Sequence, residues 1–179
     1  GINATSQLKA IQKFIELNEI KKTIFLTPKV NYEAEIEIAL SNSKLKIIKN
    51  YVYDSDPTKL TNQIEKITNY QRRKQNLEDE IVRLENSNEI NKERLIEKLK
   101  KKDTLGNVNF DSVIIADFDE SLKSVTTSLL YTDVSPKKKY FITLNQWFDE
   151  SLLKEASSQP IYFPSINKKN YENFSLEYH

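Results

Sequence analysis

The stretch Thr23-Ile24-Phe25-Leu26-Thr27-Pro28 determines which fold class the chain can adopt. A short, continuous run of β-branched and aromatic residues that ends at a proline is typical of a strand buried on both faces. On either side of this run, apolar residues recur every three or four positions, within residues 5–18 and from Asn31 onward. That spacing predicts an amphipathic helix before the strand and another after it.

The same alternation continues along the rest of the chain. Further strands are expected within residues 45–52, 113–117, 140–144 and 161–163, and further helices within residues 120–131, 148–156 and 168–178. Alternating strands and helices predict an α/β three-layer sandwich. We expect a mostly parallel, flavodoxin-like sheet of about five strands with helices on both faces.

Residues 57–103 interrupt this pattern. The segment is rich in charged side chains, and Tyr70 is its only aromatic residue. Apolar positions from Leu60 to Leu84 recur in steps of three, four and seven, which predicts one long helix from Pro57. A break at residues 86–88 precedes a second helix. We therefore expect residues 1–179 to form a single lobe, with residues 57–103 inserted as a projecting helical hairpin.

The composition excludes several kinds of chemistry. Cysteine is absent, the single histidine is His179, and the only glycines are Gly1 and Gly106. These counts exclude a thiolate metal site, catalysis by an internal histidine, and the glycine-rich loops of dinucleotide and P-loop sites. We expect no cofactor and no metal. Methionine is absent as well, so we interpret the chain as a piece of a longer protein.

Charge and hydropathy limit the partners of the chain. The net charge is +1 over 179 residues, which gives no global electrostatic argument for nucleic acid or an anionic membrane. No run of apolar residues is long enough for a transmembrane segment. Three basic clusters, at residues 72–74, 100–102 and 137–139, lie among acidic residues, and we expect them to be solvated surface.

Ligands of open α/β sheets bind beyond the carboxyl ends of the strands. Four residues lie at or just after the expected strand ends, and we expect them to face one edge of the sheet: Tyr32, Asp117, Asn145 and Trp147. Asp117 would pair with a ligand ammonium, while Trp147 or Tyr32 would cover an apolar part of the ligand.

Each of these candidates also has a structural explanation. Asp117 has the position of a helix cap, Trp147 is equally suited to anchor packing, and Tyr32 fits the inner face of its own helix. Asn145 is otherwise an ordinary loop residue. No nucleophile has a recognisable base beside it, so we expect a binding site and not an enzyme.

A phospho-acceptor receiver domain is a specific competitor, because it also has an aspartate after its third strand. Such a domain needs an acidic pair after the first strand to hold Mg²⁺. Residues 27–31 read Thr-Pro-Lys-Val-Asn instead, so metal-assisted phosphorylation has no site here.

Several short motifs, taken in chain order, support a resemblance to a known family. They are GINATSQ at residues 1–7, FLTP at 25–28, YVYDSD at 51–56, YQRR at 70–73, FDSVIIAD at 110–117, SLLYTDV at 128–134 and LNQW at 144–147. In this order they resemble the second lobe of type I periplasmic solute-binding proteins, the leucine/isoleucine/valine-binding group. The resemblance is nearer to the lipoprotein branch of penicillin-binding-protein activators, in which a helical insertion with Tyr-x-x-Arg is common.

The resemblance implies two functions. The first is the non-enzymatic ligand-binding lobe of an extracytoplasmic solute receptor, which delivers an amino-acid-like solute to an ABC transporter and shares its cleft with a second lobe of the same parent chain. The alternative is a periplasmic lipoprotein domain that activates a penicillin-binding protein in peptidoglycan synthesis. Both imply a periplasmic location, and the alternative implies a lipid anchor in the N-terminal part of the parent.

Overall fold

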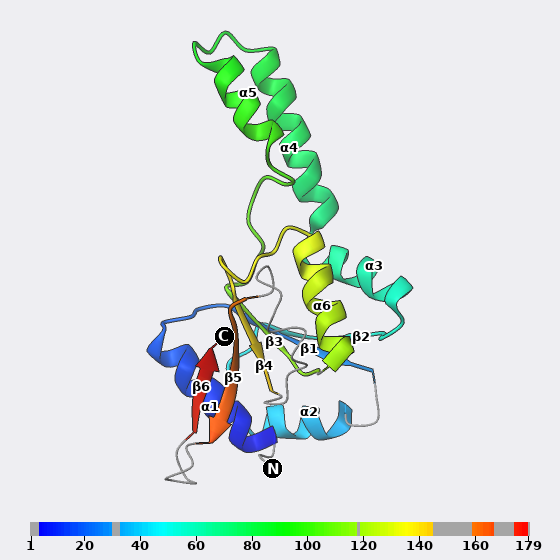
Figure 1. The fold of residues 1–179 in the computed structure, drawn as a ribbon, viewed down its shortest axis with the longest axis vertical. Helices are drawn as coiled ribbons and strands as arrows, with labels where there is room; N and C mark the ends of the chain where they lie inside the picture. The colour runs from blue at the N-terminus through cyan, green and yellow to red at the C-terminus, as the bar shows by residue number, and fades with distance from the viewer. Residues whose placement is uncertain (1–3, 30–32, 118, 145–158, 167–173, 179) are drawn as a thin grey trace.

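A six-stranded sheet forms the centre of the computed structural model, which describes residues 4–29, 33–117, 119–144, 159–166 and 174–178 (Figure 1). The strands are β1 (Thr23–Pro28), β2 (Lys49–Tyr53), β3 (Ser112–Ile115), β4 (Tyr140–Thr143), β5 (Ile161–Ile166) and β6 (Phe174–Tyr178). Strands β1 to β5 are parallel, and β6 is antiparallel to β5. The expected α/β class with a mostly parallel sheet is confirmed.

The strand order is β2-β1-β3-β4-β5-β6, so β1 lies between two parallel neighbours. Its first five strands follow the doubly wound order of flavodoxin. Leu26 of β1 is in register with Tyr51 on one side and Ile115 on the other. All six residues of β1 are buried, as a continuous apolar run predicts for a strand covered on both faces.

Two helical layers cover the sheet. One layer consists of α1 (Ala4–Leu17) and α2 (Glu33–Ser41), and the other of α3 (Pro57–Ile67) and α6 (Asp119–Tyr131). The pleat of β1 divides its side chains between them: Phe25 packs with α1 and α2, whereas Ile24 and Leu26 pack with α3 and α6. Each such buried side chain contributes about 1.5–3 kcal/mol.

The single long helix expected from Pro57 is wrong, because the chain forms two helices there. Helix α3 ends at Ile67, and α4 (Tyr70–Glu85) begins after Asn69, which has φ 51° and ψ 39°. Asparagine tolerates this left-handed conformation better than most residues, so it redirects the chain. Leu60, Ile64 and Ile67 of α3 lie in the core of the sandwich. Only the part that follows Asn69 projects.

Helices α4 and α5 (Lys92–Lys100) form the projecting hairpin (Figure 1). Helices α3 and α6 run back along the sheet from the carboxyl ends of β2 and β3, so the hairpin extends beyond the amino ends of the strands. The structure describes every residue of α5, and none is buried. Among the described residues, no helix combines the length and the apolar character that a membrane span requires.

Arg73 anchors the foot of the hairpin to the end of α6. Its side chain is 3% exposed, and both terminal guanidinium nitrogens donate to the carbonyl oxygen of Thr132, Nη1 at 2.7 Å. That carbonyl directly follows the last residue of α6, at the C-terminal end of the helix, where a positive charge is favourable. Burial lowers the pKa of Arg73, and the nearby carboxylate of Asp133 partly offsets this effect. The rings of Tyr70 and Tyr131 add a second contact, with centroids 5.4 Å apart.

The turn that follows α6 is fixed by its own backbone. Asp133 is left-handed, with φ 61°, and its N–H donates to the carbonyl of Leu130 at 3.0 Å. The N–H of Val134 donates to the carbonyl of Leu129 at 2.9 Å, and both of these side chains lie in the core. This pattern is a Schellman motif with its apolar contact, so Arg73 docks on a rigid helix end.

The helix expected at residues 168–178 is wrong in its second half, because residues Phe174–Tyr178 form strand β6. The sequence Phe-Ser-Leu-Glu-Tyr alternates strictly between apolar and polar residues, which suits an edge strand that pairs with β5. The helix expected at residues 148–156 lies outside the described residues.

Candidate functional site

The carboxyl edge of the sheet is the position of the predicted site. Asp117 follows β3 directly and is the one member of the predicted set that the structure describes. Tyr32, Asn145 and Trp147 lie outside the described residues. Strands β1 and β4, which precede them in the chain, end at the same edge as β3 because all three are parallel. The sharing of one edge by the four side chains therefore stays a prediction.

Hydrogen bonds beyond the ladder, two between backbone groups and one from a side-chain hydroxyl, hold the strand ends together. Lys29 donates its N–H to the carbonyl of Tyr53 at 2.9 Å, and Ala116 donates to the carbonyl of Leu26 at 2.8 Å. The Thr143 hydroxyl donates to the carbonyl of Asp117 at 3.2 Å. These bonds tie β2 to β1, β1 to β3 and β3 to β4. In this strand order, the crevice for ligands falls between the ends of β1 and β3, beside Asp117.

Asp117 forms a buried hydrogen bond with Tyr53, which the set of predicted site residues did not include. The Tyr53 hydroxyl donates to Asp117 Oδ2 at 2.5 Å, and the two residues are 1% and 4% exposed. A hydrogen bond to a charged acceptor in a buried setting is short and strong. It fixes the orientation of the carboxylate. The structural explanation given above, in which Asp117 only caps a helix, does not account for this contact with Tyr53.

A cavity of about 230 Å³ adjoins this pair, where β2 leads into α3 and β3 leads into α6. It is lined by Tyr53, Ser55, Pro57, Leu60, Asp117, Glu120, Ser121 and Ser124. The lining contains two carboxylates, three serine hydroxyls and no cationic side chain. This composition favours a cationic group with hydrogen-bond donors, such as an ammonium. The volume is below the roughly 300–1,000 Å³ of complete small-molecule sites, so it suits part of a ligand.

The sequence contains a weak signal for Tyr53. Tyr53 directly follows the strand expected within residues 45–52, and Asp54-Ser55-Asp56 marks the end of that strand. A tyrosine at the carboxyl end of a parallel strand was therefore identifiable. Its pairing with Asp117, which is 64 positions away, follows only from the strand order.

The described site contains acidic and hydroxyl groups. Within residues 4–29, 33–117, 119–144, 159–166 and 174–178, no group of three or more histidine, cysteine, aspartate or glutamate residues has a geometry that holds a metal ion. The edge thus provides a fixed carboxylate, a phenol and serine hydroxyls, which are groups that select a ligand by charge and hydrogen bonds.

Comparison with known proteins supports the fold. No family model and no curated protein sequence matches the chain. Among solved structures, the chain resembles an extracellular ligand-binding receptor from Verminephrobacter eiseniae with a TM-score of 0.52 and 10% sequence identity, over 90% of this chain and 37% of the receptor. It also matches a structure of the TorS sensor domain–TorT complex without ligand, with a TM-score of 0.42 and 13% identity, over 91% of this chain and 44% of that one.

The first of these similarities shows the fold, whereas the second is too weak to support an argument. The chain therefore shares the fold of part of that receptor. It spans little more than a third of the length of the receptor it resembles, at 37%. The activity and partners of a whole receptor do not transfer with the fold.

Proposed function

We propose that the chain is a non-enzymatic ligand-binding lobe of an extracytoplasmic solute receptor. The observation that carries this proposal is the carboxylate of Asp117, which Tyr53 orients beside a small acidic cavity at the carboxyl edge of the sheet. The ligand is a small amino-acid-like solute, and its ammonium group enters the cavity. Delivery to an ABC transporter and a periplasmic location are parts of the same proposal.

The shape of the site explains why a second lobe of the parent protein belongs to this function. The cavity of about 230 Å³ beside Asp117 accommodates a charged head group and leaves the rest of a solute outside. Tyr32, Asn145 and Trp147 would cover the outer part of the solute from this lobe. A partner lobe would close over the other side, because binding sites for small molecules usually bury most of the ligand surface.

A second candidate function rests on a different observation. The α4–α5 hairpin projects from the opposite end of the sheet and exposes aliphatic side chains, including Ile90, which is 95% exposed. A solute receptor has no evident need for this arm. The alternative is therefore a periplasmic lipoprotein domain whose hairpin contacts and activates a penicillin-binding protein in peptidoglycan synthesis.

Binding of amino acids to the full-length parent protein tests the first proposal. Isothermal calorimetry with the twenty standard amino acids would compare the wild type with Asp117→Asn, which preserves the shape of the side chain and removes its charge. The matched control is Asp111→Asn, because Asp111 precedes β3 at the amino edge and Asp117 follows it at the carboxyl edge. We expect Asp117→Asn to weaken binding by about tenfold or more, as the loss of a charged hydrogen bond implies.

The two proposals predict different results. Equal affinity of the wild type and Asp117→Asn would reject the assigned site. If the wild type binds no amino acid, and removal of residues 79–97 abolishes capture of a penicillin-binding protein, the interaction function is supported instead. The isolated chain should bind amino acids only weakly, so submicromolar affinity without the second lobe would contradict the shared cleft.

A further inference from the structure

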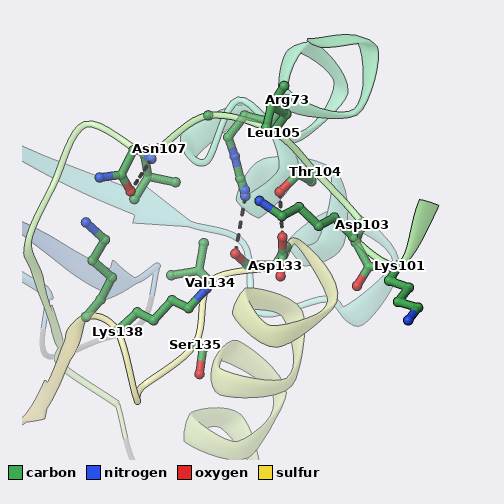
Figure 2. Close-up of a pocket in the computed structure, with 14 residues that line it drawn as sticks. Arg73, Lys101, Asp103, Thr104, Leu105, Asn107, Asp133, Val134, Ser135 and Lys138 are labelled. Carbon is green, nitrogen blue, oxygen red and sulfur yellow. Dashed lines mark hydrogen bonds between the residues drawn. The ribbon is translucent and has the colours of Figure 1, made fainter. Parts of the chain in front are cut away.

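Basic residues from three distant parts of the sequence meet at the foot of the hairpin. A cavity of about 520 Å³ lies there, at the opposite end of the sheet from Asp117. Its cationic lining consists of Arg73, Lys101, Lys102, Lys138 and Lys139. These residues belong to the three clusters that sequence reasoning assigned to solvated surface. The structure brings them around one hollow (Figure 2).

The charge in this hollow is largely uncompensated. Five cationic side chains and two carboxylates line it, in a chain whose net charge is only +1. Of the two carboxylates, Asp133 accepts a hydrogen bond from the Thr104 hydroxyl at 2.5 Å. Lys139 approaches Asp111 at 3.9 Å. Within the described part of the chain, the remaining lysines of the lining form no ion pair: Lys101, Lys102 and Lys138.

Arg73 forms a rigid part of the wall of the hollow. Arg73 is buried, and its two terminal nitrogens bond to the carbonyl of Thr132. Nη2 also lies 3.5 Å from the carbonyl oxygen of Asp133 (Figure 2). The buried Nε of Arg73 has no hydrogen-bond partner among the described residues. Unpartnered buried donors are rare in folded proteins, and each one calls for an explanation.

The lining also narrows the class of ligand. Guanidinium, ammonium and hydroxyl groups are the donors that bind phosphate oxygens. None of the fourteen lining residues is aromatic, so the hollow offers no surface on which a nucleobase would stack. Its volume exceeds what one phosphate would fill and lies in the range of about 300–1,000 Å³ that is typical of small-molecule sites.

We propose that this hollow binds a small molecule that carries two or more phosphate groups and no aromatic base. Lys101 and Lys102 follow the end of the hairpin, whereas Lys138 and Lys139 precede β4 in the body of the sandwich. A bound polyphosphate group would therefore cross-link the hairpin to the body and neutralise lysines that otherwise repel one another.

Titration of sodium pyrophosphate into the isolated chain tests this proposal. The informative variants are Lys102→Glu and Lys138→Glu, with Lys102→Ala and Lys138→Ala as milder changes. Their matched controls are Lys100→Glu and Lys137→Glu, which change the same charge one or two positions away and do not line the hollow. We expect each substitution to glutamate in the hollow to weaken binding by about tenfold or more, and each control to change it by less than about twofold.

Citrate provides the second arm of the experiment. Citrate binding without pyrophosphate binding would overturn the phosphate class. Failure of the wild type to bind pyrophosphate, or equal losses in the controls, would overturn the site. The amide signal of Gly106 gives an independent readout, because Gly106 lines the hollow and the only other glycine is Gly1. Pyrophosphate should shift that signal in the wild type and in both controls.

Discussion

Helices α3 and α5 come from the same charged segment of the sequence, yet they have opposite roles in the structure. Leu60, Ile64 and Ile67 of α3 are buried in the core beneath the sheet. Helix α5 has a comparable spacing of apolar residues, but none of its residues is buried. Its aliphatic side chains pack against α4 and stay partly exposed to solvent, as Leu95 does at 39%.

This difference shows what an amphipathic pattern does and does not specify. The pattern predicts that a helix has an apolar stripe, and it does not identify the surface that the stripe covers. The left-handed Asn69 between α3 and α4 makes that choice, because it turns the chain away from the sheet after Ile67. As a result, α3 packs on the sheet, whereas α4, the next helix in the sequence, belongs to the projecting hairpin.

The division also separates the two candidate functions in space. Helix α3 begins beside the cavity next to Asp117, whereas the hairpin begins beside the basic hollow at the other end of the sheet. Changes in the outer hairpin should therefore leave the carboxyl edge intact. The following predictions test the contrast between α3 and the hairpin.

Deletions should show the largest effect. Replacement of residues 79–97 by a short turn removes the outer hairpin and retains Tyr70, Arg73 and Leu77 at its foot. We expect this variant to fold, because no core residue of the sandwich is lost. Deletion of residues 57–103 also removes α3, so we expect that variant not to fold. Circular dichroism and a thermal melt distinguish the two results, and a folded second variant would show that α3 is dispensable.

Truncations of single buried and exposed side chains should have the next largest effect on stability. Ile64→Ala removes a fully buried side chain and should lower the free energy of unfolding by about 3 kcal/mol. Leu95→Ala removes the same kind of group from α5 and should cost less than about 1 kcal/mol. Denaturant titration measures both values. Equal losses would mean that α5 is packed as tightly as α3.

The anchor of the hairpin should have an intermediate effect. Arg73→Ala removes the hydrogen bonds to the Thr132 carbonyl at the end of α6 and should cost about 2 kcal/mol, since bonds of charged groups are worth about 1.5–3 kcal/mol. Arg72→Ala is the control, because its exposed neighbouring side chain should matter by less than about 0.5 kcal/mol. If Arg73→Ala leaves the free energy of unfolding unchanged, the hairpin is held mainly by Tyr70 and its ring contact with Tyr131.

The helix caps should give the smallest effect, which depends on pH. Asp56 accepts hydrogen bonds from the backbone N–H of Thr58 at 3.0 Å and from its hydroxyl at 2.9 Å. These bonds hold the pKa of Asp56 below its ordinary value of 3.8. The stabilisation is therefore complete above the unfolded-state pKa and is lost as the pH falls through the lower folded-state value.

Asp56→Ala should thus lower the Tm at pH 7, and the gap to the wild type should narrow as the solution is acidified below the ordinary pKa. Asn91 precedes α5 and forms no side-chain cap, so Asn91→Ala should leave the Tm unchanged at both pH values. A gap for Asp56→Ala that widens in acid would contradict the role assigned to the ionised carboxylate.

Much of the fold was predictable from the sequence, because local patterns determine it. The continuous apolar run of β1 and the alternation of strands with helices were sufficient for the α/β class. The C-terminal strand was not predictable in the same way. Phe174 and Tyr178 are four positions apart, a spacing that fits one face of a helix as well as one face of a strand, and only pairing with β5 decides between them.

The sites were predictable only in part. Parallel strand ends placed Asp117 at an edge, but its partner Tyr53 comes from a different strand. The basic clusters were visible in the sequence, but their meeting around one hollow was not, because Arg73 and Lys138 become neighbours only after the hairpin folds back onto the end of α6. Contacts between residues that are far apart in sequence depend on strand order and helix ends, which composition and periodicity do not specify.

Native-state hydrogen exchange, measured amide by amide by NMR, tests the division of the charged segment most directly. The amides of α3 should exchange with the same opening free energy as those of β1, because α3 shares the core of the sheet. The amides of α5 should exchange at a clearly lower free energy, because the hairpin can open while the sandwich stays folded. Equal protection of α5 and α3, or opening of α3 together with α5, would contradict this account.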